Sequence, residues 1–220
     1  MTLETLKRLR LVVPGVMILL FLRPLTLPVI SFQDFGQAAD LIGWARDSAL
    51  AVLLGAAYHF TRLRNKCLTK FQKEIDDNIR HQLLAPCMAD LAIAAAAEQL
   101  RRDRRLMNVF YFYIDDNESL KTRSKRVYFN GLFWSSAADL AAISVFGSFV
   151  YWAAVLLIDP RPHYMVLAGM LAVTGLASEY WLLPLITARH IGLGNEQLEF
   201  ILQNYRHDLC DRIRGAIGGF

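Results

Sequence analysis

Residues 137–158, AADLAAISVFGSFVYWAAVLLI, and residues 164–188, YMVLAGMLAVTGLASEYWLLPLITA, decide the fold class of this 220-residue chain. Both stretches are mainly apolar, and each reaches the roughly 20 residues that an α-helix needs to cross a bilayer. The five residues between them, DPRPH, contain two prolines, which stop a helix and favour a tight connection. The two stretches therefore predict a transmembrane helical hairpin.

Two further apolar segments precede the hairpin and predict two more spans. The first runs from Leu11 to Phe32 and is interrupted by Arg23, and the second runs from about Trp44 to Arg62. Basic residues before the first segment resemble the start of a signal peptide, but no small-residue cleavage site follows it. We therefore expect an uncleaved helix there and four spans in total.

The composition agrees with a membrane protein that has a charged extramembrane part. Apolar residues make up 55% of the chain and charged residues 20%, against about 45–50% and about 25% in ordinary globular domains. The mean hydropathy is +0.29. A disordered or collagen-like chain is excluded by the 11% of aromatic residues and by the 13 glycines and 7 prolines.

The distribution of Lys and Arg predicts the orientation in the membrane. Residues 1–10 contain three, residues 61–136 contain 14 and residues 188–220 contain four, whereas the segments 31–46 and 159–163 contain one each. Because basic residues concentrate on the cytoplasmic side, we expect a bacterial inner-membrane protein with both termini in the cytosol. Cys67, Cys87 and Cys210 then lie on the cytosolic side, where disulfides are rare, and we expect them to be reduced.

The predicted organisation is an all-α polytopic fold with a helical cytosolic layer. Residues 1–60 form the first two spans, residues 61–136 a cytosolic helical module, residues 137–188 the hairpin, and residues 189–220 a cytosolic amphipathic helix. Apolar spacing over 63–84 predicts that the second span continues straight into the cytosol until Ala85-Pro86. Helical composition follows over 88–108, Asp115–Ser119 offers an N-cap, and Asn130-Gly131 is a predicted break. The last helix starts at Asn195, and its apolar stripe predicts packing on protein.

Two basic clusters in residues 61–136 are the candidate binding residues. The first precedes the aromatic run FYFY at 110–113, and the second lies shortly after it; together they comprise Arg101, Arg102, Arg104, Arg105, Lys121, Arg123, Lys125 and Arg126. Topology and attraction to anionic lipid explain such clusters best. A nucleotide, nucleic acid or other anionic ligand, or an acidic protein partner, remain alternatives.

Charges inside the predicted spans form a second set of candidates. Arg23 and Glu179 lie about 18 Å and about 15 Å from the cytosolic ends of their helices, at 1.5 Å per residue. A lone charge at such a depth costs at least ~2.5–3.5 kcal/mol, which predicts that the two charges pair or line a hydrated cavity. Asp47 is a rival partner for Arg23.

No catalytic, metal-binding or cofactor-binding motif is present in the sequence, so we expect a non-enzymatic protein without a cofactor. The favoured function is a homo-oligomeric membrane subunit whose basic, aromatic cytosolic face binds a protein partner or ligand. By analogy of architecture, such a subunit would serve a prokaryotic defence or stress system. The alternative is a pore-forming channel or membrane-depolarising effector that a cytosolic anionic ligand gates.

Overall fold

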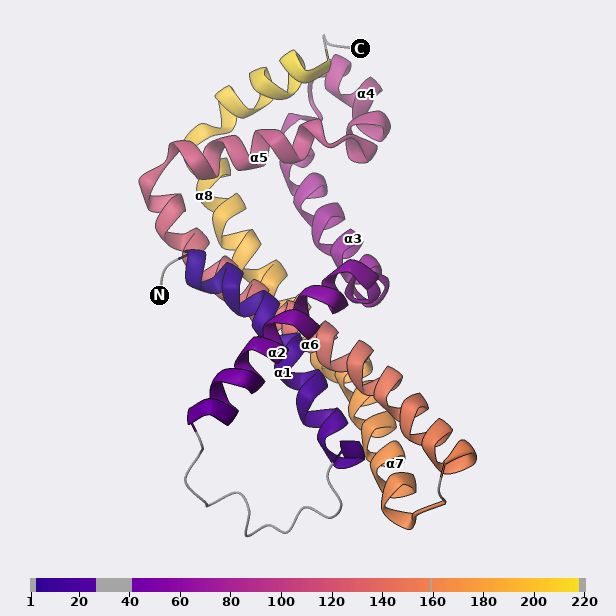
Figure 1. The fold of residues 1–220 in the computed structure, drawn as a ribbon. Helices are drawn as coiled ribbons and strands as arrows, with labels where there is room; N and C mark the ends of the chain where they lie inside the picture. The colour runs from indigo at the N-terminus through magenta and orange to yellow at the C-terminus, as the bar shows by residue number, and fades with distance from the viewer. Residues whose placement is uncertain (1–2, 27–40, 159, 218–220) are drawn as a thin grey trace. The chain divides into compact units, whose positions relative to one another are not determined.

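The computed structural model describes residues 3–26, 41–158 and 160–217, and helices make up almost all of them (Figure 1). No β-strand occurs in these ranges, which confirms the predicted all-α class. In chain order the elements are α1 (Leu3–Thr26), α2 (Leu41–Thr61), α3 (Leu63–Leu84), the 3₁₀ turn η2 (Ala85–Cys87), α4 (Leu91–Arg102), α5 (Arg105–Asp116), α6 (Glu118–Leu157), α7 (Pro162–Ala177), the π-helical turn η3 (Ser178–Leu182) and α8 (Leu183–Ile217).

The chain divides into two compact units, each formed from two separate segments. Unit 1 comprises residues 1–69 and 132–185, and unit 2 comprises residues 70–131 and 186–220. Helices α3 and α6 contribute residues to both units, as does α8. Each unit has its own set of buried side chains.

In unit 1, helices α1 and α2 approach each other very closely at two glycines. A Cβ atom at Gly15 would collide with the carbonyl oxygen of Ala51, and one at Gly55 would collide with that of Leu11. Small residues allow helix backbones to reach this separation, as they commonly do in membrane helix pairs. The packing of α1 on α2 therefore depends on the absence of side chains at these two positions.

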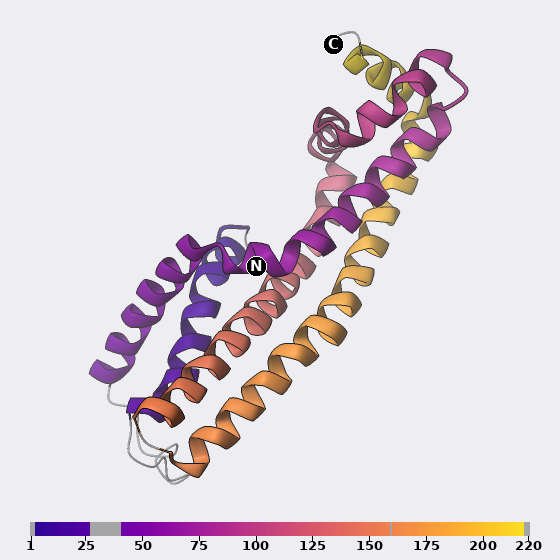
Figure 2. The ribbon, with the colours of Figure 1, turned by 90° about the vertical axis from the view of Figure 1, so that its right-hand side faces the viewer.

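The predicted hairpin is present in unit 1 as α6 and α7, which run side by side (Figure 2). The Ser148 hydroxyl donates to the carbonyl of Ala168 at 2.9 Å, and the Ser178 hydroxyl donates to that of Ala137 at 2.8 Å. The Tyr151 hydroxyl donates to the carbonyl of Phe21 at 2.6 Å, which joins α6 to α1. These three hydroxyls thus find acceptors in the backbones of neighbouring helices, which offsets the cost of burying them in an apolar surrounding.

Two helical stretches are long and apolar enough to cross a membrane, namely Glu118–Leu157 and Pro162–Ile217, whereas Ala49–Thr61 is a shorter apolar helix. Large apolar side chains on the two long stretches are exposed, including Phe149, Leu157 and Val173, at 68%, 83% and 67%. A surface of this kind is what lipid would cover. Spans at 11–32 and 44–62 remain predictions, and residues 27–32 lie outside the described residues.

Unit 2 has a core that draws on α3, α4, α5, α6 and α8. The fully buried side chains include Leu83, Ile93, Leu100, Leu106, Leu120, Leu198, Ile201, Leu209 and Ile213. Four residues of the apolar stripe predicted for the tail are fully buried here, which confirms that the stripe packs on protein; they are Leu198, Ile201, Leu209 and Ile213. The predicted N-cap is also present, because Asn117 Oδ1 accepts from the backbone N–H groups of Ser119 and Leu120.

Four details of the helix boundaries differ from the prediction. Helix α2 does not continue straight into α3, because Arg62 has a positive φ of 55° and interrupts the helix. The stretch 88–108 contains two helices, separated where Asp103 is extended and accepts from the N–H of Arg105. Asn130-Gly131 is not a break, since α6 passes through it. The tail helix begins at Leu183 rather than Asn195, and its backbone kinks at Tyr205.

The expectation that all three cysteines are reduced is wrong for two of them. Cys87 and Cys210 form a disulfide within unit 2, although 123 residues separate them in sequence, and Cys67 is free. The spacing of cysteines in the sequence does not reveal this pairing. It requires that the turn η2 and the end of α8 meet, which only the tertiary fold determines.

Candidate functional site

A buried ion pair in unit 1 is the most tightly organised polar feature of that unit. Arg64 Nε and Nη2 donate to Oδ1 and Oδ2 of Asp139, both at 2.6 Å. Arg64 Nη2 also donates to the carbonyl of Arg10 at 3.1 Å. The Asp139 side chain is 1% exposed and that of Arg64 13%. Two parallel hydrogen bonds to one carboxylate give this pair both strength and a fixed orientation.

This ion pair is not evident from the sequence. Asp139 is the only carboxylate in residues 137–158. A single charge in an apolar helix requires a partner, so this residue was the one indication of an ion pair in the sequence. Arg64 carries no comparable signal, since it is one of 14 basic residues in 61–136. Arg64 lies two residues after the interruption at Arg62, at the start of α3.

Glu179 lies in η3, the π-helical turn between α7 and α8, and is half-buried. Turns of this type widen a helix locally and occur often at functional positions. Burial raises the pKa of the Cys67 thiol, and the charges of Glu179 and Asp139 raise it further. Glu179 and Asp139 thus act on the same neighbour in unit 1.

The predicted pairing of Arg23 with Glu179 stays a prediction, since no ion pair between them is found among the described residues. Arg23 is exposed near the end of α1. Pairing between subunits stays a prediction. The side chain of Asp47, the rival partner, lies outside the described residues.

Four of the eight predicted binding cations are engaged within unit 2. Arg105 donates to the carbonyl of Ala216 at 3.1 Å, and Arg123 donates to that of Glu196 at 3.4 Å while lying over the Phe200 ring at 5.3 Å. Two others form ion pairs one helical turn apart, Arg102 with Glu98 and Lys121 with Glu118. Arg105 and Arg123 therefore contribute to the fold, because they satisfy helix carbonyls or cover an aromatic ring.

The other four cations leave their charge at the surface of unit 2. Arg101, Lys125 and Arg126 are exposed and form no ion pair with a described residue. Arg104 is exposed and lies near Asp76; burial raises the pKa of Asp76, while the charges of Arg80 and Arg104 act in the opposite direction. Tyr128 is 45% exposed, three residues from Lys125 on the same helix. These residues retain the cationic and aromatic character that the sequence predicted.

A separate polar cluster connects α5 to the end of α8 in unit 2. The Tyr113 hydroxyl donates to Oδ2 of Asp208 at 2.7 Å, and Arg212 Nε donates to the same oxygen at 2.7 Å. The Arg212 guanidinium also lies over the Phe112 ring at 3.9 Å. The hydrogen bond from Arg212, followed by that from Tyr113, holds the pKa of Asp208 below its ordinary value.

No group of three or more His, Cys, Asp or Glu residues that could hold a metal ion occurs in the part of the chain that the structure describes. The arrangement offers two kinds of chemistry: a buried ion pair within an apolar unit, and exposed cations beside aromatic rings on a polar unit. No family model, curated protein or solved structure matches this chain.

Proposed function

We propose that this chain is a non-enzymatic, homo-oligomeric subunit of a bacterial inner membrane. Unit 1 anchors it in the bilayer, and unit 2 binds a cytosolic protein partner or anionic ligand. The observation that carries this proposal is the division of the chain into one unit whose long helices expose large apolar side chains and one unit with its own core and a charged surface. Lipid or a neighbouring subunit would cover the first kind of surface.

Exposed cations on unit 2 support a role in binding. Arg101, Lys125 and Arg126 are exposed and form no ion pair or ring contact with a described residue, and Arg104 is exposed beside Asp76. A side chain that no internal contact requires is available to an acidic partner, and adjacent aromatic rings such as Tyr128 favour planar or anionic ligands. The proposal places the partner on these residues rather than on Arg105 or Arg123.

Cysteine labelling in intact cells tests the proposed orientation. Arg161 is exposed in the connection before α7, and Lys125 is exposed on unit 2. A membrane-impermeant maleimide should label Arg161→Cys from outside, and it should label Lys125→Cys only after the membrane is permeabilised. Labelling of Lys125→Cys in intact cells would contradict the proposed topology.

Photo-crosslinking tests the binding role in native membranes. A photoreactive residue at Tyr128 should give adducts with a second copy or a partner, and an adduct with a partner should disappear when Arg101, Lys125 and Arg126 are replaced by Gln. The matched control replaces Arg102, which pairs with Glu98, and should leave the adducts unchanged. A chain that remains a monomer in mild detergent and gives no adduct would contradict the proposal. Ion flux through liposomes that contain only this protein would favour a channel instead.

A further inference from the structure

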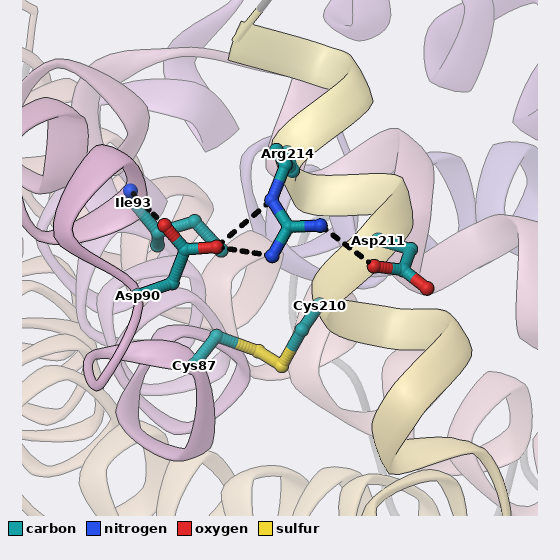
Figure 3. Close-up of a disulfide and its surroundings, with 6 residues drawn as sticks. All are labelled: Cys87, Asp90, Ile93, Cys210, Asp211 and Arg214. Carbon is teal, nitrogen blue, oxygen red and sulfur yellow. Dashed lines mark hydrogen bonds and ion pairs between the residues drawn. A yellow bond between two sulfur atoms is a disulfide. The ribbon is translucent and has the colours of Figure 1, made fainter.

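The disulfide of unit 2 joins two segments that a second, non-covalent contact also joins (Figure 3). Cys87 ends the turn η2, and Cys210 lies on α8 beyond the kink at Tyr205. Asp90, three residues after Cys87, accepts from Arg214 Nε at 2.8 Å and also from its Nη2. The bond therefore closes beside an ion pair with the same two partners, the η2–α4 connection and the end of α8.

This end of α8 has non-covalent contacts that hold it without the disulfide. Leu209 and Ile213 are fully buried in unit 2, and Arg105 holds the last helical turn by donating to the carbonyl of Ala216. Asp90 is also fixed from its own side, because it caps α4 by accepting from the N–H of Ala92 at 2.8 Å. The two segments are therefore joined by contacts that do not involve the sulfur atoms.

The charge distribution indicates that this disulfide lies in the cytosol, where disulfides are rare. The two segments of unit 2 contain 15 of the 24 Lys and Arg residues, and such basic segments stay in the cytosol. Thiols are kept reduced there, and the disulfides that do occur in the cytosol are commonly transient or redox-sensing. A permanent structural cross-link does not fit that location, whereas a reversible one does.

We propose that Cys87 and Cys210 form a reversible thiol–disulfide modification site that responds to the redox state of the cytosol and regulates how firmly residues 206–217 are held. The proposal rests on the cytosolic location of unit 2 given under the proposed function. Its co-reactants are a dithiol reductant of the thioredoxin class and, in the opposite direction, a low-molecular-weight disulfide. The free Cys67 lies in unit 1 and takes no part in the site.

Burial determines which sulfur atom reacts first. Cys87 is 2% exposed, whereas Cys210 is half-buried. A reductant thiolate attacks Sγ of Cys210, a mixed disulfide forms there, and the Cys87 thiolate leaves and takes up a proton. The second thiol of the reductant then attacks its own sulfur in the mixed disulfide and releases Cys210 as a thiolate, which is protonated in turn. Two electrons and two protons thus pass from the dithiol to the protein. Oxidation by a low-molecular-weight disulfide re-forms the bond between Cys87 and Cys210 and yields two molecules of the corresponding thiol.

The first experiment counts thiols in living cells. Cells that produce the Cys67→Ser variant in full-length form are quenched with acid, denatured, and treated with a maleimide that adds a resolvable mass per thiol. We expect two modified thiols in untreated cells, none after the oxidant diamide, and two again after diamide is removed. Two results overturn the proposal. The first is a thiol count that stays at two under diamide. The second is a thiol count of zero in untreated cells that stays at zero after purified membranes are exposed to reduced thioredoxin.

The Lys125→Cys labelling described above separates the two ways in which this proposal could fail. A permanently closed disulfide together with labelling of Lys125→Cys from outside means that the orientation is wrong as well. A permanently closed disulfide with Lys125→Cys protected means that the orientation holds and only the reversible site fails. The two results are read from different residues and do not depend on each other.

The second experiment measures the consequence of opening the site in the purified full-length protein. Reduction should accelerate amide hydrogen exchange in residues 206–217 by roughly tenfold or more, because a cross-link across a long loop is lost, while residues 132–157 of α6 should exchange at an unchanged rate. Arg214→Gln should increase the effect, since it removes the parallel ion pair. Equal exchange in the oxidised and reduced proteins overturns the regulatory role even if the thiol count changes.

Discussion

Arg64 and Asp139 form a two-point ion pair inside unit 1, with both guanidinium-to-carboxylate distances at 2.6 Å, although 75 residues separate them in sequence. The same guanidinium reaches the carbonyl of Arg10, so one side chain connects α1, α3 and α6. Removing two charges from water carries a large penalty, and their attraction offsets it only when the geometry is good. The pair therefore specifies one arrangement of these helices more than it adds net stability.

We expect each single substitution of this pair to destabilise the protein more than the double substitution does. Arg64→Leu or Asp139→Leu leaves one buried charge without its partner, at a loss of about 3–5 kcal/mol, whereas the double variant leaves none. Folded yield in membranes and thermal unfolding in detergent measure the effect. The exposed pair Arg102 and Glu98 is the matched control, and its substitution should change neither quantity. Additive losses at Arg64 and Asp139 would contradict an interaction between them.

Substituting either glycine of the α1–α2 contact should disrupt that contact. Even Gly15→Ala or Gly55→Ala places a methyl group against a backbone carbonyl of the facing helix, and backbone cannot move aside as a flexible side chain can. We expect reduced folded yield and a lower unfolding temperature for both variants. Gly169→Ala is the control, because a Cβ atom there would meet nothing within 4 Å. Stability equal to the control would show that α1 and α2 do not pack through these residues.

The helices were largely predictable from sequence because their signals are local. Apolar length identified the hairpin of α6 and α7, the Ala85-Pro86 step ended α3, and Asn117 was recognisable as a cap. The predicted helix break at Asn130-Gly131 was wrong because an isolated turn-forming dipeptide is tolerated inside a helix when packing requires it. Here the Asn130 amide donates to the carbonyl of Ile186 at 3.3 Å, so its side chain serves a contact within unit 2.

The candidate sites were less predictable because they depend on contacts between distant segments. Nothing in the sequence distinguishes Arg105 from Arg101, yet the first donates to a carbonyl 111 residues away and the second stays at the surface. The bond between Cys87 and Cys210 is hidden for the same reason. Charge counts identify which segments are basic, whereas the fold decides which basic residues remain available.

Acidification should weaken the attachment of the end of α8 in unit 2. The pKa of Asp208 is held below its ordinary value by hydrogen bonds from Arg212 and Tyr113. A carboxylate whose pKa is lower in the folded state than in the unfolded state stabilises the fold at pH values above its unfolded-state pKa of about 3.9. That stabilisation is lost as the pH falls through the folded-state pKa. Pulsed hydrogen exchange of residues 206–217 in urea should therefore show constant stability from pH 7 to pH 5 and a decline below about pH 4.

The variant Asp208→Asn identifies the group responsible for this decline. It should be less stable than the wild type at pH 7, and the difference should shrink below about pH 4, where the wild-type carboxylate is protonated as well. Asp115→Asn removes the same charge from an exposed position on α5 and should behave as the wild type at every pH. A difference between Asp208→Asn and the wild type that is independent of pH would exclude this carboxylate as the cause.

Neutralising the basic residues one by one should separate those that fold unit 2 from those that serve its partner. Arg105→Gln removes the donor to the carbonyl of Ala216 and should increase hydrogen exchange near the C-terminal end of α8. Arg101→Gln and Lys125→Gln remove charges that no internal ion pair uses, so they should leave exchange unchanged while weakening the adduct that the photoreactive residue at Tyr128 captures. A loss of stability in Arg101→Gln or Lys125→Gln would show that these side chains maintain the fold. Unchanged capture in both variants would instead assign binding to a different surface of unit 2.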